Sequence, residues 1–123
     1  MTTPCFEIVT YTVGNSEGAD RARRKAQELL SAFPGFIAWT AFSGTENSTK
    51  RADLVVWQSP EEAQSAAEAV SIDPAFDDFR ASITGVTSME HYSTQTGCSF
   101  ANSNRKRRPC PAALSPLLLI WNR

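Results

Sequence analysis

The sequence predicts an α+β domain with a ferredoxin-like βαββααβ order, in which a four-stranded antiparallel sheet packs on helices. Segments within 6–13, 36–42, 52–57 and 86–92 are rich in β-branched and aromatic residues and alternate as strands do. Between them, one segment repeats apolar residues at steps of three and four. Two more segments open with a helix cap followed by proline. These three observations indicate the type and order of the elements.

The chain begins with a strand over 6–13 and a helix over 17–33. Side chains of the strand alternate between two faces, and Glu7 and Tyr11 share one of them. Alanine and leucine recur along one face of the helix. The basic cluster Arg21, Arg23, Arg24 and Lys25 could bind an anion, but we expect it to form a helix face that points to solvent.

A hairpin is predicted next, with a polar, glycine-containing loop over 44–51. Pro34-Gly35 ends the preceding helix, because glycine accepts the left-handed conformation past a helix C-terminus and proline cannot continue the helix. Both strands of the hairpin carry large apolar residues on both faces. A sheet covered by helices on one side alternates between apolar and polar side chains. The second face is therefore expected to have a cover of its own.

Two short helices precede the last strand. The Ser59 hydroxyl is expected to accept from the N–H of Glu62, while the Glu62 carboxylate reaches back to the N–H of Ser59. Asp73-Pro74 repeats the cap-plus-proline start. The helix that follows is expected to include Ile83 and to end at Gly85.

The composition is that of one domain, with 41% hydrophobic and 20% charged residues in 123. We assign residues 1–94 to this domain and 95–123 to an extension that is disordered or docked, because neither helix nor strand periodicity continues there. Thirteen acidic and seven basic side chains precede residue 94, and five basic ones follow it. An acidic body argues against a nucleic-acid-binding surface.

Cysteine usage and hydropathy indicate the compartment. The three cysteines form no C-x-x-C pair and leave an odd count, so neither a zinc site nor a disulfide framework is expected. The longest apolar run, Leu117–Ile120, is far too short to span a bilayer. A cytoplasmic protein without membrane association is the expectation.

Four motifs carry a resemblance to a known family: residues 34–36, 55–57, 59–63 and 73–76. In this order and spacing they resemble the antibiotic biosynthesis monooxygenase family of small dimeric α+β barrels, over roughly residues 5–93. The resemblance implies a homodimer and a chemistry drawn from cofactor-free oxygenases, haem-degrading enzymes or isomerases. Haem degradation is disfavoured, because the first strand lacks the asparagine of those relatives and the helices lack their tryptophan and histidine. No cofactor and no metal are expected.

Three residues are candidates for catalysis. His91 is the single histidine, and its imidazole could take a proton from a phenolic or enolisable substrate. Tyr11 or Arg80 could steady the resulting oxyanion. The alternatives are a hydrogen-bonded structural histidine, a buried tyrosine with a backbone partner and an exposed helix arginine.

A cavity is predicted between the sheet and the second and third helices. It would bind a flat apolar or aromatic ligand, and its wall is expected to include Trp39, Trp57, Phe76, Phe79 and Met89, beside the catalytic candidates. The alternative is that these side chains are ordinary core.

Two functional hypotheses follow. One is a cofactor-independent monooxygenase acting on a small aromatic or quinone-like compound. The other is a non-catalytic dimeric ligand-binding or stress-associated barrel. Either is expected to be a homodimer joined face to face through its sheets, because the two-sided apolar strands would otherwise expose a patch of several hundred Å². A charged residue at Trp39 or Trp57 is expected to give insoluble or unfolded protein.

Overall fold

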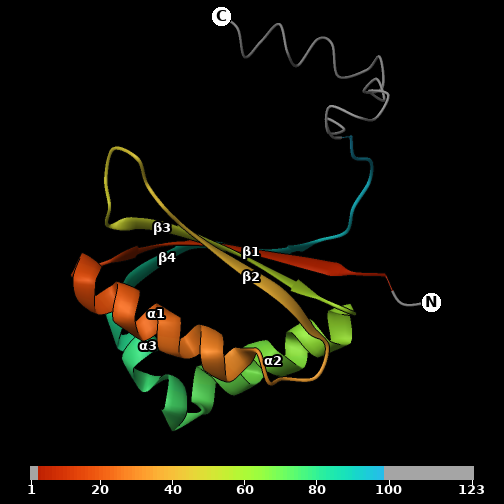
Figure 1. The fold of residues 1–123 in the computed structure, drawn as a ribbon, viewed down its shortest axis with the longest axis horizontal. Helices are drawn as coiled ribbons and strands as arrows, with labels where there is room; N and C mark the ends of the chain where they lie inside the picture. The colour runs from red at the N-terminus through yellow and green to blue at the C-terminus, as the bar shows by residue number, and fades with distance from the viewer. Residues whose placement is uncertain (1–2, 99–123) are drawn as a thin grey trace, which may run out of the picture. The chain divides into compact units, whose positions relative to one another are not determined.

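The computed structural model describes residues 3–98 and contains the predicted order of strands and helices. In chain order the elements are β1 (Cys5–Val13), α1 (Ser16–Leu30), β2 (Phe36–Ser43), β3 (Lys50–Trp57), α2 (Pro60–Ile72), the 3₁₀ turn η1 (Pro74–Phe76), α3 (Asp77–Ser82) and β4 (Ile83–Tyr92). The strands form one antiparallel sheet in the order β2-β3-β1-β4. The helices lie on one face of this sheet (Figure 1). The predicted α+β class and ferredoxin-like order are therefore confirmed.

The helix starts follow their capping residues. Asn15 accepts a hydrogen bond from the N–H of Gly18 at the start of α1, and Ser59 accepts one from the N–H of Glu62 at the start of α2. The Glu62 carboxylate accepts from the Ser59 hydroxyl at 3.0 Å, whereas the sequence-based expectation was the backbone N–H. The predicted cap is therefore confirmed for the N–H of Glu62 and wrong for the partner of the Glu62 carboxylate.

The turn before β2 is built around Gly35, whose φ is +82°. A Cβ at this position would lie 2.0 Å from Glu62 Oε2, so glycine is required both by the backbone and by the approach of α2. The Gly35 carbonyl also accepts from the N–H of Gln58, which joins this turn to the end of β3. The start of β2 and the start of α2 are therefore packed together.

Two expectations about local structure are wrong. Ile83 begins β4 instead of ending a helix, because it pairs with Val13 and packs with the buried cluster around Tyr11. The strand then continues through Gly85. Cys98 is disulfide-bonded, which the odd cysteine count did not predict, whereas Cys5 is free and buried.

The core lies between the sheet and the helices. Its largest fully buried side chains are Trp57 and Phe76, and alanines of α1 and α2 let these helices approach the sheet closely. All elements belong to the unit Met1–Ser93. The proposed division near residue 94 stays a prediction, and most of the extension, with its basic run, lies outside the described residues.

A β-bulge after Phe36 decides which apolar residues of β2 face the helices. Because of it, Phe36 and Trp39 both lie on the helix-covered face, where they pair with Trp57 and Val55. The opposite face carries further apolar side chains: Ile8, Phe42 and Leu54, the first two of them exposed.

Candidate active site

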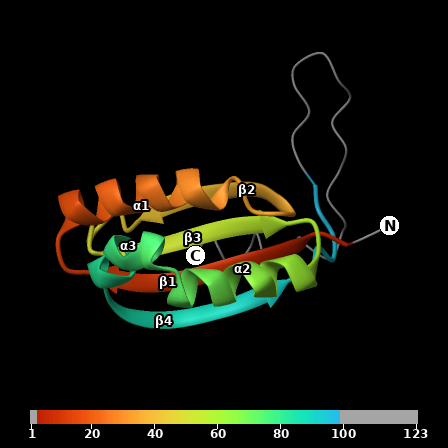
Figure 2. The same ribbon diagram turned by 90° about the horizontal axis from the view of Figure 1, so that it is seen from below.

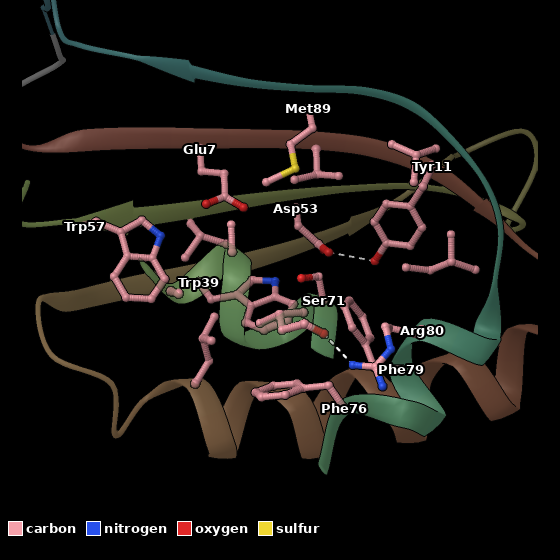
Figure 3. Close-up of a pocket in the computed structure, with 18 residues that line it drawn as sticks. Glu7, Tyr11, Trp39, Asp53, Trp57, Ser71, Phe76, Phe79, Arg80 and Met89 are labelled. Carbon is pink, nitrogen blue, oxygen red and sulfur yellow. Dashed lines mark hydrogen bonds between the residues drawn. The ribbon is translucent and has the colours of Figure 1, made fainter. Parts of the chain in front are cut away.

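A cavity of about 270 Å³ lies between the sheet and the helices α2, η1 and α3. Its floor and sides are mostly apolar, and polar side chains of β1 and β3 point into it from the sheet (Figure 3). Strand β4 forms one edge of the sheet (Figure 2). Its residues Val86 and Met89 also line the cavity and are exposed, so the cavity reaches solvent there. The structure thus has a cavity where the sequence predicts one.

The five predicted substrate-binding residues all line this cavity: Trp39, Trp57, Phe76, Phe79 and Met89. Several of them also belong to the core. The Trp39 and Phe79 rings meet edge to face with centroids 5.7 Å apart, and Phe76 meets Phe33 in the same way at 6.0 Å. The two alternatives for these side chains are therefore compatible, since one face of the aromatic core is the wall of the cavity.

Tyr11 lines the cavity, but its hydroxyl belongs to a buried network. It donates to Asp53 Oδ2 at 2.7 Å and accepts from Arg23 Nε and Nη2 at 3.2 and 2.9 Å. Arg23 Nη2 also lies 3.1 Å from Asp53 Oδ1 and donates to the Phe42 carbonyl. This network joins α1 to β1, β2 and β3. Burial, followed by the Asp53 charge, raises the pKa of Tyr11, so the phenol keeps its proton.

Arg80 also lines the cavity, and its guanidinium caps the C-terminal end of α2. Its Nη1 donates to the carbonyl oxygens of Val70 and Asp73, and its Nη2 contacts the Asp77 carboxylate. A cation that binds the last carbonyls of a helix stabilises that helix end. These contacts use three of the five N–H donors of the guanidinium.

His91 is not among the residues that line the cavity. It stands opposite Glu7 in the pairing of β1 with β4, and its Nε2 lies 3.5 Å from Glu7 Oε1. Glu7 does line the cavity, and its carboxylate points into it (Figure 3). The structure therefore connects the predicted base to the cavity through a carboxylate that the sequence did not suggest.

Burial is the main cause that raises the pKa of Glu7, and its neighbours His91 and Trp57 oppose this shift. Burial also raises the pKa of Asp53, against the hydrogen bond from Tyr11 and the charge of Arg23. The buried indole nitrogens of Trp57 and Trp39 lie near these two carboxylates. Neither makes a hydrogen bond of ordinary geometry with any described residue. The sheet side of the cavity thus combines two carboxylates, each with an indole N–H beside it that favours its charged form: Trp57 at Glu7 and Trp39 at Asp53.

Sequence reasoning missed Glu7, Asp53 and Arg23. Arg23 is buried, so the expectation that the whole basic run of α1 points to solvent is wrong at this residue. The sequence did contain a signal for Glu7, which shares its strand face with Tyr11 and Val13. An acidic side chain on a face that packs against the core needs a polar partner there. Nothing local indicated that the partner would come from β4.

The described residues contain no group of three metal-ligating side chains. Over the same part of the chain, no helix is both long and apolar enough to cross a membrane.

Solved structures with this fold are numerous, although no family model and no curated protein matches the sequence. SnoaB, a cofactor-independent oxygenase from Streptomyces nogalater, aligns with a TM-score of 0.62 at 15% identity, over 80% of this chain and 97% of that one. A "putative antibiotic biosynthesis monooxygenase" from Bordetella bronchiseptica gives 0.67 at 11%, over 77% and 100%. PA3566 from Pseudomonas aeruginosa gives 0.61 at 20%, over 78% and 98%. The resemblance to the antibiotic biosynthesis monooxygenases is therefore confirmed as one of fold.

Proposed function

We propose that this protein is a cofactor-independent monooxygenase that acts on a small aromatic or quinone-like compound in the cavity under the sheet. The observation that carries the proposal is the cavity itself, an apolar and aromatic space with the Glu7 carboxylate pointing into it. Proton abstraction by a carboxylate set among apolar side chains is the chemistry that such an arrangement favours. The likeness in fold to SnoaB supports the same reaction class.

The size and shape of the cavity favour a compact, flat ligand. Its volume of about 270 Å³ is slightly below the range of about 300–1,000 Å³ that is typical of ligand sites. The edge-to-face pair of Trp39 and Phe79 offers a flat ring surface on one side. A compound of two or three fused rings meets both conditions.

The reaction needs a substrate that can reduce dioxygen itself. A base removes a proton from an activated ring methylene, and the resulting carbanion gives its electrons to dioxygen. One oxygen atom enters as a carbonyl in place of the two methylene hydrogens, and the other leaves as water, so the substrate supplies all four electrons. In this reaction His91 is the base of the protein, and Arg80 or Tyr11 donates a hydrogen bond to the oxyanion. Tyr11 must give up its hydrogen bond to Asp53 to do so, whereas Arg80 has N–H donors beyond the three that its contacts use.

Oxygen uptake tests this function directly. Purified protein with a panel of anthrones and hydroquinones should consume oxygen, and the anthrone product should carry one atom from labelled dioxygen. The His91→Ala variant should be slower by about 100-fold, the lower end of general-base effects. Absence of uptake with every compound, while the compounds bind, would refute the oxygenase assignment.

The alternative is a non-catalytic ligand-binding protein, and the hydrogen-bond partners of Tyr11 and Arg80 favour it, because both donors already bind protein groups. Such a protein would bind the same compounds and rise in melting temperature without turnover. The uptake assay and a thermal shift with the same panel therefore separate the two functions.

We further propose a homodimer in which the open faces of two sheets pack together. Exposed Ile8 and Phe42, with half-buried Leu54 beside them, form an apolar surface on the face opposite the helices. An isologous pairing through a two-fold axis would bury this surface on both subunits.

A further inference from the structure

We propose that Glu7 is the base that takes the proton from the ligand and that His91 passes this proton from Glu7 to solvent. The inference rests on the proposed function for its ligand class, an enolisable or phenolic aromatic compound. It changes the role of His91 from the base that meets substrate to a positioning and proton-carrying residue. Glu7 becomes the catalytic residue.

The geometry places the two groups in series between the cavity and solvent. Glu7 is on β1, and His91 is its direct partner on β4, the edge strand of the sheet. The Glu7 side chain is 12% exposed and lines the cavity, whereas the His91 side chain is 41% exposed and does not. With 3.5 Å between Oε1 and Nε2, a small side-chain rotation is enough for a hydrogen bond.

Asp53 is the other carboxylate of the cavity, and it is less suited to this role. Its Oδ2 accepts the Tyr11 hydroxyl, and its Oδ1 lies against the Arg23 guanidinium. Proton uptake by Asp53 would break a buried ion pair, which is strongly unfavourable. Glu7 has no arginine or lysine beside it, and its surroundings favour the protonated form.

The groups that face Glu7 come from four elements. His91 on β4 and Trp57 on β3 favour the charged carboxylate, Asp53 on β3 opposes it, and the Cys5 thiol lies near it on β1. The α2 residues that line the cavity, including Ala66 and Val70, carry no charge. His91 is therefore the neighbour that can remove a proton from Glu7.

Each step of the proton transfer breaks one bond to hydrogen and forms one, and no atom changes its oxidation state. The C–H or O–H bond of the ligand breaks, and its proton forms a new bond to Glu7 Oε1. That bond then breaks as neutral His91 accepts the proton at Nε2, which leaves a carboxylate next to an imidazolium. The imidazolium releases the proton to water at the edge of the sheet.

Hydrogen exchange under argon tests this relay without any oxygenation. The probe is 2-tetralone, a two-ring ketone with acidic hydrogens on the methylene between its ring and its carbonyl. In D₂O, proton NMR follows the loss of the methylene signal. Wild-type protein should accelerate exchange over buffer, and Glu7→Gln should reduce the protein-dependent rate by about 100-fold or more. The matched control Glu28→Gln changes an exposed carboxylate of α1 that does not line the cavity, and it should leave the rate unchanged.

His91 is tested by chemical rescue. His91→Ala should lower the exchange rate by about tenfold, and added imidazole should restore it, because the small base fits the space left by the side chain. Imidazole should not restore Glu7→Gln. A purely structural histidine would show no such rescue. Thermal melts of each variant verify folding, and Glu7→Asp, which keeps a carboxylate, should retain part of the rate.

Several results would overturn the relay: no acceleration by wild-type protein, full exchange in Glu7→Gln, or an unchanged rate in His91→Ala. The two proposals can fail separately. Exchange without oxygen uptake refutes the oxygenase and leaves the relay, whereas oxygen uptake that survives Glu7→Gln refutes the relay and leaves the oxygenase.

Discussion

At the scale of single residues, Glu7 is a carboxyl group that folding places among apolar side chains. Burial raises its pKa, so the folded state binds this proton more tightly than the unfolded chain does. The sign of the effect on stability follows. Below the unfolded pKa of about 4.3 the buried acid is neutral and carries no penalty. Above its folded pKa the buried charge destabilises the fold.

Glu7→Gln should therefore raise the melting temperature at pH 7 and 8, and the gain should shrink as the pH falls toward about 4. The amide has nearly the shape of the carboxylate and no charge to bury. Thermal melts by circular dichroism across this pH range measure the effect, with Glu28→Gln as the exposed control. A lower melting temperature at pH 8 would mean that the pair with His91 outweighs the burial of charge.

The Tyr11, Asp53 and Arg23 network is the second feature at this scale. The Tyr11 hydroxyl both donates and accepts hydrogen bonds, and the buried charge of Arg23 is paired with that of Asp53. Such a network rigidifies its surroundings when it is complete. It holds one wall of the cavity in place, and this is a sufficient reason for Tyr11 to be buried there.

At the scale of elements, the contact between the Gly35 turn and the start of α2 positions the helix over the cavity. Gly35→Ala should destabilise the protein, because the left-handed backbone alone costs a non-glycine residue about 1–2 kcal/mol. The new Cβ would also displace the Glu62 carboxylate from Ser59.

A double-mutant cycle with Glu62→Ala separates these two causes. Gly35→Ala should cost less in the Glu62→Ala background, where only the backbone term remains. Urea unfolding of the four proteins gives the free energies. Equal costs in both backgrounds would show that the approach of Glu62 has no energetic consequence.

At the scale of the whole molecule, the proposed homodimer rests on the open face of the sheet. Apolar burial contributes about 25 cal/mol per Å², so a patch of several hundred Å² favours association even after the loss of rigid-body freedom. Trp39 and Trp57 lie on the helix-covered face, so charges there would disrupt the core and would not report on the interface.

The residues to change are instead Ile8 and Leu54, which are neighbours on the open face. Wild-type protein should be a dimer at micromolar concentration by light scattering, and Ile8→Lys with Leu54→Lys should abolish that dimer. The control is Ile72→Lys, at the end of α2, where the side chain is already 79% exposed. A well-folded wild-type monomer would contradict the proposed interface.

The sequence by itself determined the elements, their order and the boundaries marked by Gly35, Ser59 and Asp73. Capping, turn chemistry and side-chain periodicity act between residues close in the chain, so they can be read locally. The aromatic residues of the cavity were also predictable, because apolar strand and helix faces must meet.

Only the tertiary structure decided which polar residues those faces would bring together. The bulge after Phe36 put Phe36 and Trp39 on the same face of the sheet, and strand pairing set His91 next to Glu7. The local pattern of α1 predicts that Arg23 is exposed. It is buried instead, because it pairs with Asp53 on β3. These contacts depend on register between strands far apart in the chain, and a shift of one residue would turn each side chain to the other face.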